Sequence, residues 1–246
     1  MLLILNKKIT FVLILLTVML SSMMVVSAND NNATFIEPND ELNINEIYVS
    51  PNGSDKEGIG NNDSPFQSIS HAVNMAGNNS KIILKDGREI NAELYPEVAP
   101  ITVANFLKLI DERYFDGVIF HRVIDRFMIQ TGGYYIEGNT LMEKEGAKTI
   151  KGEFASNGVE NTLKHKIGVL SMARTNDPNS ASGQFFICSA SCAHLDGAYA
   201  AFGKVVDELS LATVLDISHV ETTNIGYGFA DFPVEPIAIK TIVRNK

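Results

Sequence analysis

The chain has 246 residues, enough for one large domain or for one domain with an appended segment, and its 45% hydrophobic and 20% charged residues are typical of a globular protein with a buried core. Its 20 Lys and Arg residues stand against 29 Asp and Glu residues, so the net charge is −9. No basic cluster is available to neutralise phosphates, which argues against nucleic acid as a partner.

The N-terminal segment, residues 1–28, has the pattern of a secretory signal peptide. Lys7-Lys8 supplies positive charge, residues 9–20 are mostly apolar, and Val26-Ser27-Ala28 fits a cleavage site built from small residues. We therefore expect an exported protein (secreted, extracytoplasmic or at the cell surface), whose mature chain has 18 basic against 29 acidic residues, a net charge of −11. The alternative is an uncleaved membrane anchor, because residues 9–26 are just long enough to span a bilayer.

Residues 29–80 are predicted to form a linker and a short N-terminal appendage. The first part, residues 29–46, is rich in Asn and acidic residues and is typical of a disordered linker. Residues 47–55 then predict a strand that ends in a turn, and residues 64–76 predict a helix. Together, residues 47–87 resemble the N-terminal opening of parallel β-helix surface proteins. No further rungs follow, and one rung cannot bury its own face, so the resemblance implies a capping segment.

Residues 81–95 predict a β-hairpin, and residues 96–113 predict an amphipathic helix. Asp86-Gly87 indicates a type I′ turn between two alternating strands. Pro100 suits the first turn of the helix. The helix has one apolar face, formed by Val103, Phe106, Leu107 and Ile110. Residues 82–87 suit both the β-helix-like segment and the hairpin, so the domain boundary near residue 81 stays open by about ten residues.

The stretch Phe120–Gly133 is the most unusual in the chain. The run from Val118 to Ile124 predicts a strand with a single cation, Arg122, inside it. After a polar break come two large apolar residues, an amide and a Gly pair. One interpretation is a core strand whose Arg extends its charged group to solvent. The other is a functional site in which a guanidinium lies beside an apolar patch.

The downstream half of the chain adds strands and a second helix. Residues 172–187 form a polar loop that leads into a strand with Gln184, Phe186 and Cys188 on one face. Further strands are predicted at 167–173 and within 194–205, a closing strand at 237–243, and a helix that begins near Asp207. Many short strands with one early and one late helix favour a mainly β fold, a closed barrel capped at its ends.

Taken together, Phe120–Gly133, Met172–Ile187 and His194–Val205 resemble the cyclophilin family of peptidyl-prolyl isomerases, over residues 81–246. The resemblance implies a closed, eight-stranded antiparallel β-barrel capped by two α-helices. It also implies catalysed rotation about Xaa-Pro bonds in proline-containing segments of unfolded or exported proteins. Because no bond breaks in this reaction, neither a metal nor a cofactor is expected.

The resemblance also assigns the site residues. Arg122 would be the catalytic residue, and an apolar pocket would hold the proline ring. The substrate-binding residues would be Phe127, Met128, Gln130, Ala173, Gln184, Phe186, His194, Leu195 and Tyr199. His121 would be a structural neighbour of the site, because alternation along a strand turns it away from Arg122.

The chain departs from the family pattern at three places. The family often has Trp where this chain has His194, and His where it has Tyr199, which argues against tight cyclosporin binding. Residues 138–152 replace a Gly-rich loop at the rim of the groove. Cys188 and Cys192 are predicted to be free thiols, because a strand would hold their α-carbons too far apart for a disulfide. The alternative function is a non-catalytic module that binds proline-containing segments.

Overall fold

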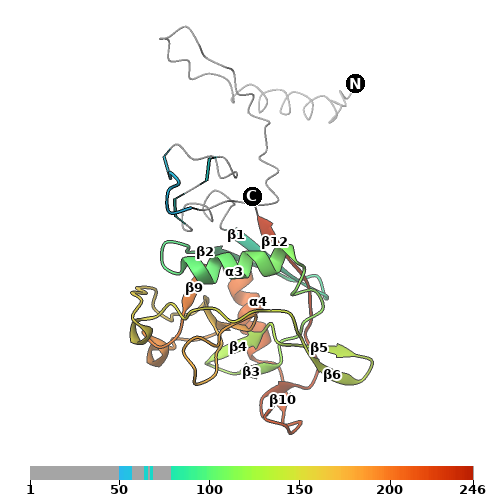
Figure 1. The fold of residues 1–246 in the computed structure, drawn as a ribbon. Coiled ribbons are helices and arrows are strands. Elements are labelled where there is room, and N and C mark those ends of the chain that lie inside the picture. The colour runs from blue at the N-terminus through green and yellow to red at the C-terminus, as the bar shows by residue number, and fades with distance from the viewer. Residues whose placement is uncertain (1–49, 57–63, 66, 69–78, 246) are drawn as a thin grey trace, which may run out of the picture. The chain divides into compact units, whose positions relative to one another are not determined.

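The computed structural model describes residues 50–56, 64–65, 67–68 and 79–245 (Figure 1). The predicted signal peptide and the linker at 29–46 lie outside the described residues, as do residues 47–49 and 69–76 of the predicted strand and helix. Of the predicted helix, residues 64–65 and 67–68 are described, with bends at Ser64 and Gln67. Asp55 Oδ1 accepts hydrogen bonds from the backbone N–H groups of Gln67 and Ser68 at 2.8 and 2.9 Å.

The core of the fold is an eight-stranded antiparallel sheet with the strand order β12-β1-β2-β9-β7-β8-β4-β3. Its strands are β1 (Asn79–Leu84), β2 (Glu89–Leu94), β3 (Arg122–Ile124), β4 (Met128–Thr131), β7 (Val169–Met172), β8 (Phe185–Cys188), β9 (Ala201–Val205) and β12 (Ile239–Asn245). Two small hairpin sheets join β5 (Tyr134–Glu137) to β6 (Thr140–Glu143) and β10 (Thr222–Thr223) to β11 (Phe232–Pro233). The helices are α3 (Pro100–Asp111) and α4 (Glu208–Ser218), with the short 3₁₀ turns η1 (Ala155–Asn157) and η2 (Ala193–Leu195).

The predicted strand count and the two helices are confirmed, but the sheet is open and does not close into a barrel. The strands β12 and β3 are its two ends, and no ladder joins them within the described residues. The strand β3 is only three residues long, and the N–H of Val123 donates to the carbonyl of Asp231, in the β10–β11 connection, at 2.9 Å. The segment that precedes β3 is linked instead to the start of β12 and the residues before it: Phe120 N donates to Ile237 O and Ile239 N to Val118 O, at 3.0 and 2.8 Å.

The first hairpin forms as predicted, with a different turn. A type I′ turn needs two residues with positive φ, and here Gly87 alone has one, at 92°. Gly87 N donates to Leu84 O at 3.1 Å and Leu84 N to Arg88 O at 2.9 Å, which gives a three-residue loop. The buried residues of both strands alternate as the sequence indicates. At the junction that the sequence left open, residues 82–84 belong to β1 and residues 85–87 form its loop to β2.

Both helices pack into the same core as the sheet (Figure 1). Helix α3 begins at Pro100 and buries the predicted apolar face, while residues 96–99 form a turn before it. The Phe106 ring lies 5.2 Å from those of Phe115 and Phe185 and 5.1 Å from that of Phe202. Helix α4 follows the predicted cap, since Asp207 Oδ1 accepts from the N–H of Ser210 at 2.7 Å.

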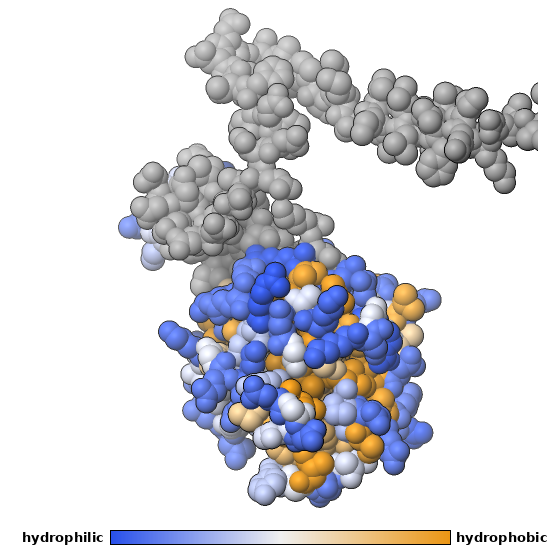
Figure 2. Space-filling model, turned by 90° about the vertical axis from the view of Figure 1, so that its right-hand side faces the viewer, coloured by the Kyte–Doolittle hydropathy of each residue, from blue (hydrophilic) through white to orange (hydrophobic). Residues whose placement is uncertain are grey.

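Apolar side chains also reach the surface, as Figure 2 shows for one face. Exposed large hydrophobic residues include Ile136 in β5 and Ile225, Tyr227 and Val234 in or beside the β10–β11 connection. Within the described residues, no helix is both long enough and apolar enough to cross a membrane.

Candidate active site

A row of side chains, one from each of four adjacent strands, builds the site. Arg122 in β3 lies opposite Gln130 in β4, Gln130 lies opposite Phe186 in β8, and Phe186 lies opposite Ser171 in β7. Directly opposed residues of antiparallel strands share one face of the sheet, so the pairing gathers residues that are up to 64 positions apart in sequence. The predicted cation, amide and aromatic ring are thereby neighbours.

Beside this row lies a second apolar cluster, separate from the main core, which we call the outer cluster. Alternation in β8 creates it: Phe185 and Ile187 face the main core, whereas Phe186 and Cys188 face the outer cluster. Its buried members are Met128, Val169, Phe186, Cys188, Cys192, Leu195 and Ala201, and Ile124, Phe127, Leu163, Ala173 and Tyr199 pack against it partly exposed. The structure thus brings together the apolar residues predicted to hold the proline ring: Phe127, Met128, Phe186 and Leu195.

His194 and Tyr199, two of the predicted substrate-binding residues, contact this cluster through their rings. The rings of Phe127 and His194 have centroids 5.3 Å apart, and those of Phe186 and Tyr199 are 6.1 Å apart at a steep angle of 79°. Phe127 is held by its backbone, because its carbonyl accepts hydrogen bonds from Ser189 N at 3.0 Å and from Cys192 Sγ at 3.2 Å. The result is an apolar floor with partly exposed aromatic sides.

Arg122 stands at the edge of this floor with its side chain 44% exposed. Its Nε lies 3.6 Å from Asp231 Oδ2, a half-exposed ion pair of the kind that contributes about 1 kcal/mol or less. The guanidinium is therefore oriented but not sequestered. The interpretation of Arg122 as a core residue that merely extends to solvent accounts for its exposure but not for the amide and aromatic residues aligned beside it.

Two glutamines form the polar side of the site. Gln130 Nε2 donates to Gln184 Oε1 at 3.0 Å. The Gly pair in front of them leaves the room they need: a Cβ at Gly133 would lie 2.5 Å from the Gln184 side-chain amide, and one at Gly132 would lie 2.2 Å from the carbonyl oxygen of Gly183. With a cation, an apolar floor and paired amides, the site can bind an apolar ring and bond the peptide groups that flank it.

A protein-family model described as cyclophilin type peptidyl-prolyl cis-trans isomerase matches residues 80–244. The chain belongs to the cyclophilin family. A peptidyl-prolyl cis-trans isomerase of Acinetobacter baylyi is 41% identical over 158 residues, which cover 62% of this chain and 78% of the relative. Peptidyl-prolyl cis-trans isomerase B of Bacillus subtilis is 43% identical over 130 residues, covering 53% and 85%.

Solved structures agree with this assignment. A cyclophilin-type peptidyl-prolyl cis-trans isomerase of Cryptosporidium parvum, crystallised in the presence of the dipeptide Ala-Pro, is 28% identical with a TM-score of 0.55, and the match covers 68% of this chain and 99% of that one. The cyclophilin described here is accordingly an enzyme, a peptidyl-prolyl cis-trans isomerase of class EC 5.2.1.8.

His121 is buried, with 4% of its surface exposed, whereas its neighbour Arg122 is exposed. Its ring centroid lies 4.8 Å from that of Tyr134 and 6.3 Å from that of Phe229. Burial lowers the pKa of His121 to about 4, so the imidazole is neutral at pH 7. His121 is thus buried and Arg122 exposed, as the alternation of side chains along a strand predicts.

Three hydrogen-bonded side chains, Ser171, His165 and Asp196, support the floor of the cyclophilin site, and the sequence did not indicate this arrangement. His165 Nδ1 lies 3.0 Å from Asp196 Oδ1, and His165 Nε2 lies 3.0 Å from Ser171 Oγ. Burial lowers the pKa of His165, while Asp196 opposes that shift. The order Ser-His-Asp is that of a hydrolase triad, but Ser171 is 0% exposed and cannot meet a substrate. These three side chains instead lie next to Phe186, whose ring stacks on the His165 ring with centroids 6.2 Å apart.

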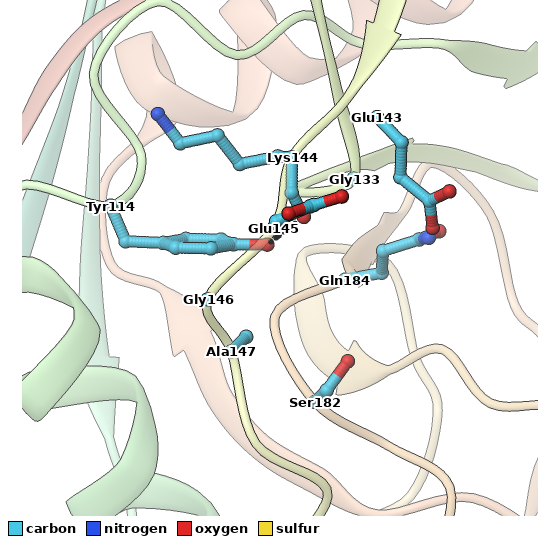
Figure 3. A pocket seen from close by; sticks show the side chains of 9 residues that line it. All are labelled: Tyr114, Gly133, Glu143, Lys144, Glu145, Gly146, Ala147, Ser182 and Gln184. Atoms are coloured by element: carbon cyan, nitrogen blue, oxygen red, sulfur yellow. Dashed lines mark hydrogen bonds between the residues drawn. The ribbon is translucent and has the colours of Figure 1, made fainter.

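A cleft of about 320 Å³ adjoins Gln184 on the side of the Gly pair (Figure 3). It contains the carboxylates of Glu143 and Glu145, whereas the ammonium group of Lys144 lies over the Tyr114 and Tyr135 rings, at 5.7 and 5.5 Å. Burial, and secondarily the charge of Glu143, raises the pKa of Tyr114 to about 12. Residues 143–147 of the cleft belong to the segment that replaces the Gly-rich loop of the family. The sequence showed that this segment differs from the family, but it did not predict the cleft.

Cys188 and Cys192 are free thiols, as predicted, and both are buried in the outer cluster. Burial raises the pKa of each thiol, so neither is a reactive thiolate at pH 7. Within the described residues, no group of three His, Cys, Asp or Glu side chains is arranged to hold a metal ion.

Proposed function

We propose that this cyclophilin uses Arg122 as its catalytic residue and the outer cluster as its proline pocket. Rotation about an Xaa-Pro bond is slow because amide resonance imposes a barrier of about 18–20 kcal/mol. A hydrogen bond from Arg122 to the proline nitrogen favours the pyramidal nitrogen of the twisted transition state and so weakens that resonance. Arg suits this role because its charge is permanent and its donors form a rigid fork. The single observation that carries the proposal is the row that sets Arg122 beside Gln130 and Phe186.

The remaining side chains divide between the ring and the flanking backbone. The proline ring packs on the apolar residues Phe127, Met128, Phe186 and Leu195, with His194 and Tyr199 at its sides. Gln130 bonds the substrate backbone, and Ala173 and Gln184 line the neighbouring groove. The presence of Ala-Pro in the Cryptosporidium parvum crystals supports proline-containing peptide segments as substrates.

The enzyme is further proposed to act outside the cytoplasm and to assist the folding of exported proteins. The signal-peptide pattern of residues 1–28 supports this proposal. N-terminal sequencing of protein recovered from the medium or the cell surface tests it: a chain that begins at Asn29 supports export with cleavage. A chain that stays inside the cell with Met1 intact contradicts it.

Protease-coupled isomerisation of a short Xaa-Pro peptide tests the catalytic role. We expect Arg122→Ala to lower kcat/KM about a hundredfold, the effect typical of losing one preorganised donor. Arg126→Ala is the matched control, because the Arg126 side chain is 89% exposed and, among the described residues, forms an ion pair with Asp125 alone, at 3.7 Å. The Arg122→Lys variant separates charge from geometry and is expected to retain little activity.

If Arg122→Ala folds normally and keeps the activity of the Arg126→Ala control, the proposed catalytic role is wrong. The alternative of a non-catalytic proline-binding module is not favoured, because the family model and the curated relatives are isomerases. A module of that kind would show equal, near-background rates for the wild-type chain and for Arg122→Ala.

A further inference from the structure

Arg174 lies beside the groove that Ala173 and Gln184 line, and its contacts have no part in the catalytic role proposed for Arg122. It follows Ala173, whose N–H donates to Gln184 O at 3.0 Å. Its guanidinium carbon lies 4.6 Å from the ring centroid of Tyr199 and 5.1 Å from that of Phe154. The cation thus contacts two aromatic rings.

Hydrogen bonds fix the plane of this guanidinium. Nε and Nη2 both donate to Ala198 O, at 3.2 and 2.9 Å, and Nη1 donates to Thr175 O at 2.8 Å. No carboxylate of the described residues forms an ion pair with Arg174. Its interactions are therefore with rings and backbone carbonyls, and these contacts select for a flat, charged, multidentate group.

The two rings differ in how firmly they are held. Phe154 is 2% exposed and belongs to the main core, so it provides a fixed surface. Tyr199 is partly exposed, and its ring contacts the Phe186 ring, with centroids 6.1 Å apart, and the Arg174 cation. Arg174 therefore connects a rigid ring of the core with a ring at the rim of the proline site.

We propose that Arg174 is a positioning residue for proline binding, which holds the Tyr199 ring against Phe186 and so fixes one wall of the pocket. It acts through Tyr199 and does not touch the proline. This inference rests on the proposed roles of Tyr199 and Phe186 in substrate binding. Arg is required because a planar guanidinium can stack on two rings while it donates to carbonyls, whereas a Lys ammonium is a compact, strongly hydrated charge.

The experiment compares Arg174→Gln, Arg174→Lys, Tyr199→Leu and the double variant Arg174→Gln/Tyr199→Leu in the full chain, with Arg126→Gln as the exposed control. We expect Arg174→Gln to raise KM about three- to tenfold, the range of one to two partly desolvated cation–π contacts, with kcat within about twofold. Arg174→Lys should lose most of the same affinity, because the charge remains and the stacking does not. In the Tyr199→Leu background, Arg174→Gln should have no further effect.

A spectroscopic measurement separates positioning from a general loss of stability. With 3-fluorotyrosine incorporated and the Tyr199 resonance assigned from Tyr199→Phe, Arg174→Lys should move that ¹⁹F resonance and Arg126→Gln should not. An unmoved resonance, or an unchanged KM with only a lower melting temperature, overturns the proposal. Independent effects of Arg174→Gln and Tyr199→Leu that multiply in the double variant also overturn it.

These outcomes can be told apart from a failure of the proposed site. If Tyr199→Leu raises KM and Arg174→Gln does not, the positioning role of Arg174 alone is wrong. If Tyr199→Leu leaves KM unchanged while Arg122→Ala is inactive, the catalytic role stands, and the pocket wall, together with the role of Arg174, is wrong.

Discussion

Replacing Glu153 should destabilise this cyclophilin more than its place in an irregular segment suggests. Glu153 is 2% exposed, and its carboxylate accepts hydrogen bonds from Ile101 N at 3.0 Å and from Thr102 N and Thr102 Oγ, both at 2.7 Å. The N-cap residue of α3, Ala99, provides no side-chain cap of its own. A side chain 51 positions away thus performs the capping of α3.

The magnitude follows from what Glu153→Ala leaves behind. Loss of the bond to the partly buried Ile101 N–H costs about 1 kcal/mol, and the buried Thr102 N–H left without an acceptor costs about 1–3 kcal/mol. We expect the free energy of unfolding to fall by about 3 kcal/mol in total. Glu153→Gln keeps one acceptor oxygen but turns an NH₂ group towards N–H and O–H donors, so it should lose about half as much.

Urea unfolding followed by far-ultraviolet circular dichroism measures both losses. With an m value of about 2 kcal/mol/M, Glu153→Ala should lower the midpoint by about 1.5 M. Glu160→Ala is the control, because Glu160 is exposed in the same segment. A midpoint for Glu153→Ala equal to that of Glu160→Ala would refute the capping role of this carboxylate.

Two further predictions concern residues next to the catalytic row. Gly133→Ala should displace the Gln184 side chain, because the new Cβ would lie 2.5 Å from its amide, and should break the hydrogen bond between Gln184 and Gln130. We expect kcat/KM to fall about fivefold, the equivalent of one hydrogen bond. Unchanged kinetics in a folded variant would contradict this prediction. His121 has a pKa of about 4 in the folded chain and an ordinary pKa of 6.5 in the unfolded chain, so the unfolded chain takes up a proton first as the pH falls. The free energy of unfolding should therefore decrease by about 3 kcal/mol between pH 7 and pH 4. Urea midpoints at pH 7, 5 and 4 should show a weaker pH dependence for His121→Phe, and parallel curves for both proteins would count against it.

Much of the fold and the site follows from local patterns. Alternation predicts the strands of the first hairpin, and the apolar face and Pro100 predict α3. The two motifs that contain Arg122 and Gln184 converge because strand pairing places Gln130 opposite both Arg122 and Phe186. Period two predicts that Phe186 and Cys188 share a face, whereas the grouping of Phe186 with Arg122 and Gln130 was predicted from the cyclophilin resemblance.

Local patterns did not predict contacts between segments that are distant in the sequence. On the edge of β3 that faces away from β4, the N–H of Val123 bonds to Asp231 and not to β12, and nothing near Val123 in sequence indicates that partner. The cap from Glu153 to Thr102 and the stacking of Arg174 on Phe154 likewise depend on how loops pass over the core. The turn at Gly87 was misjudged because Asp-Gly suits more than one hairpin loop.

The row of one residue from each strand makes the site sensitive to chain length. Side chains alternate along a strand, so one residue inserted into β4 or β8 would turn Gln130 or Phe186 towards the opposite face and would bring a core residue into the site. At Gly138, between β5 and β6, the backbone faces open space, and extra residues there would leave the row in register. Insertions and deletions are therefore tolerable at the hairpin tips of this enzyme and not within the strands that carry its row.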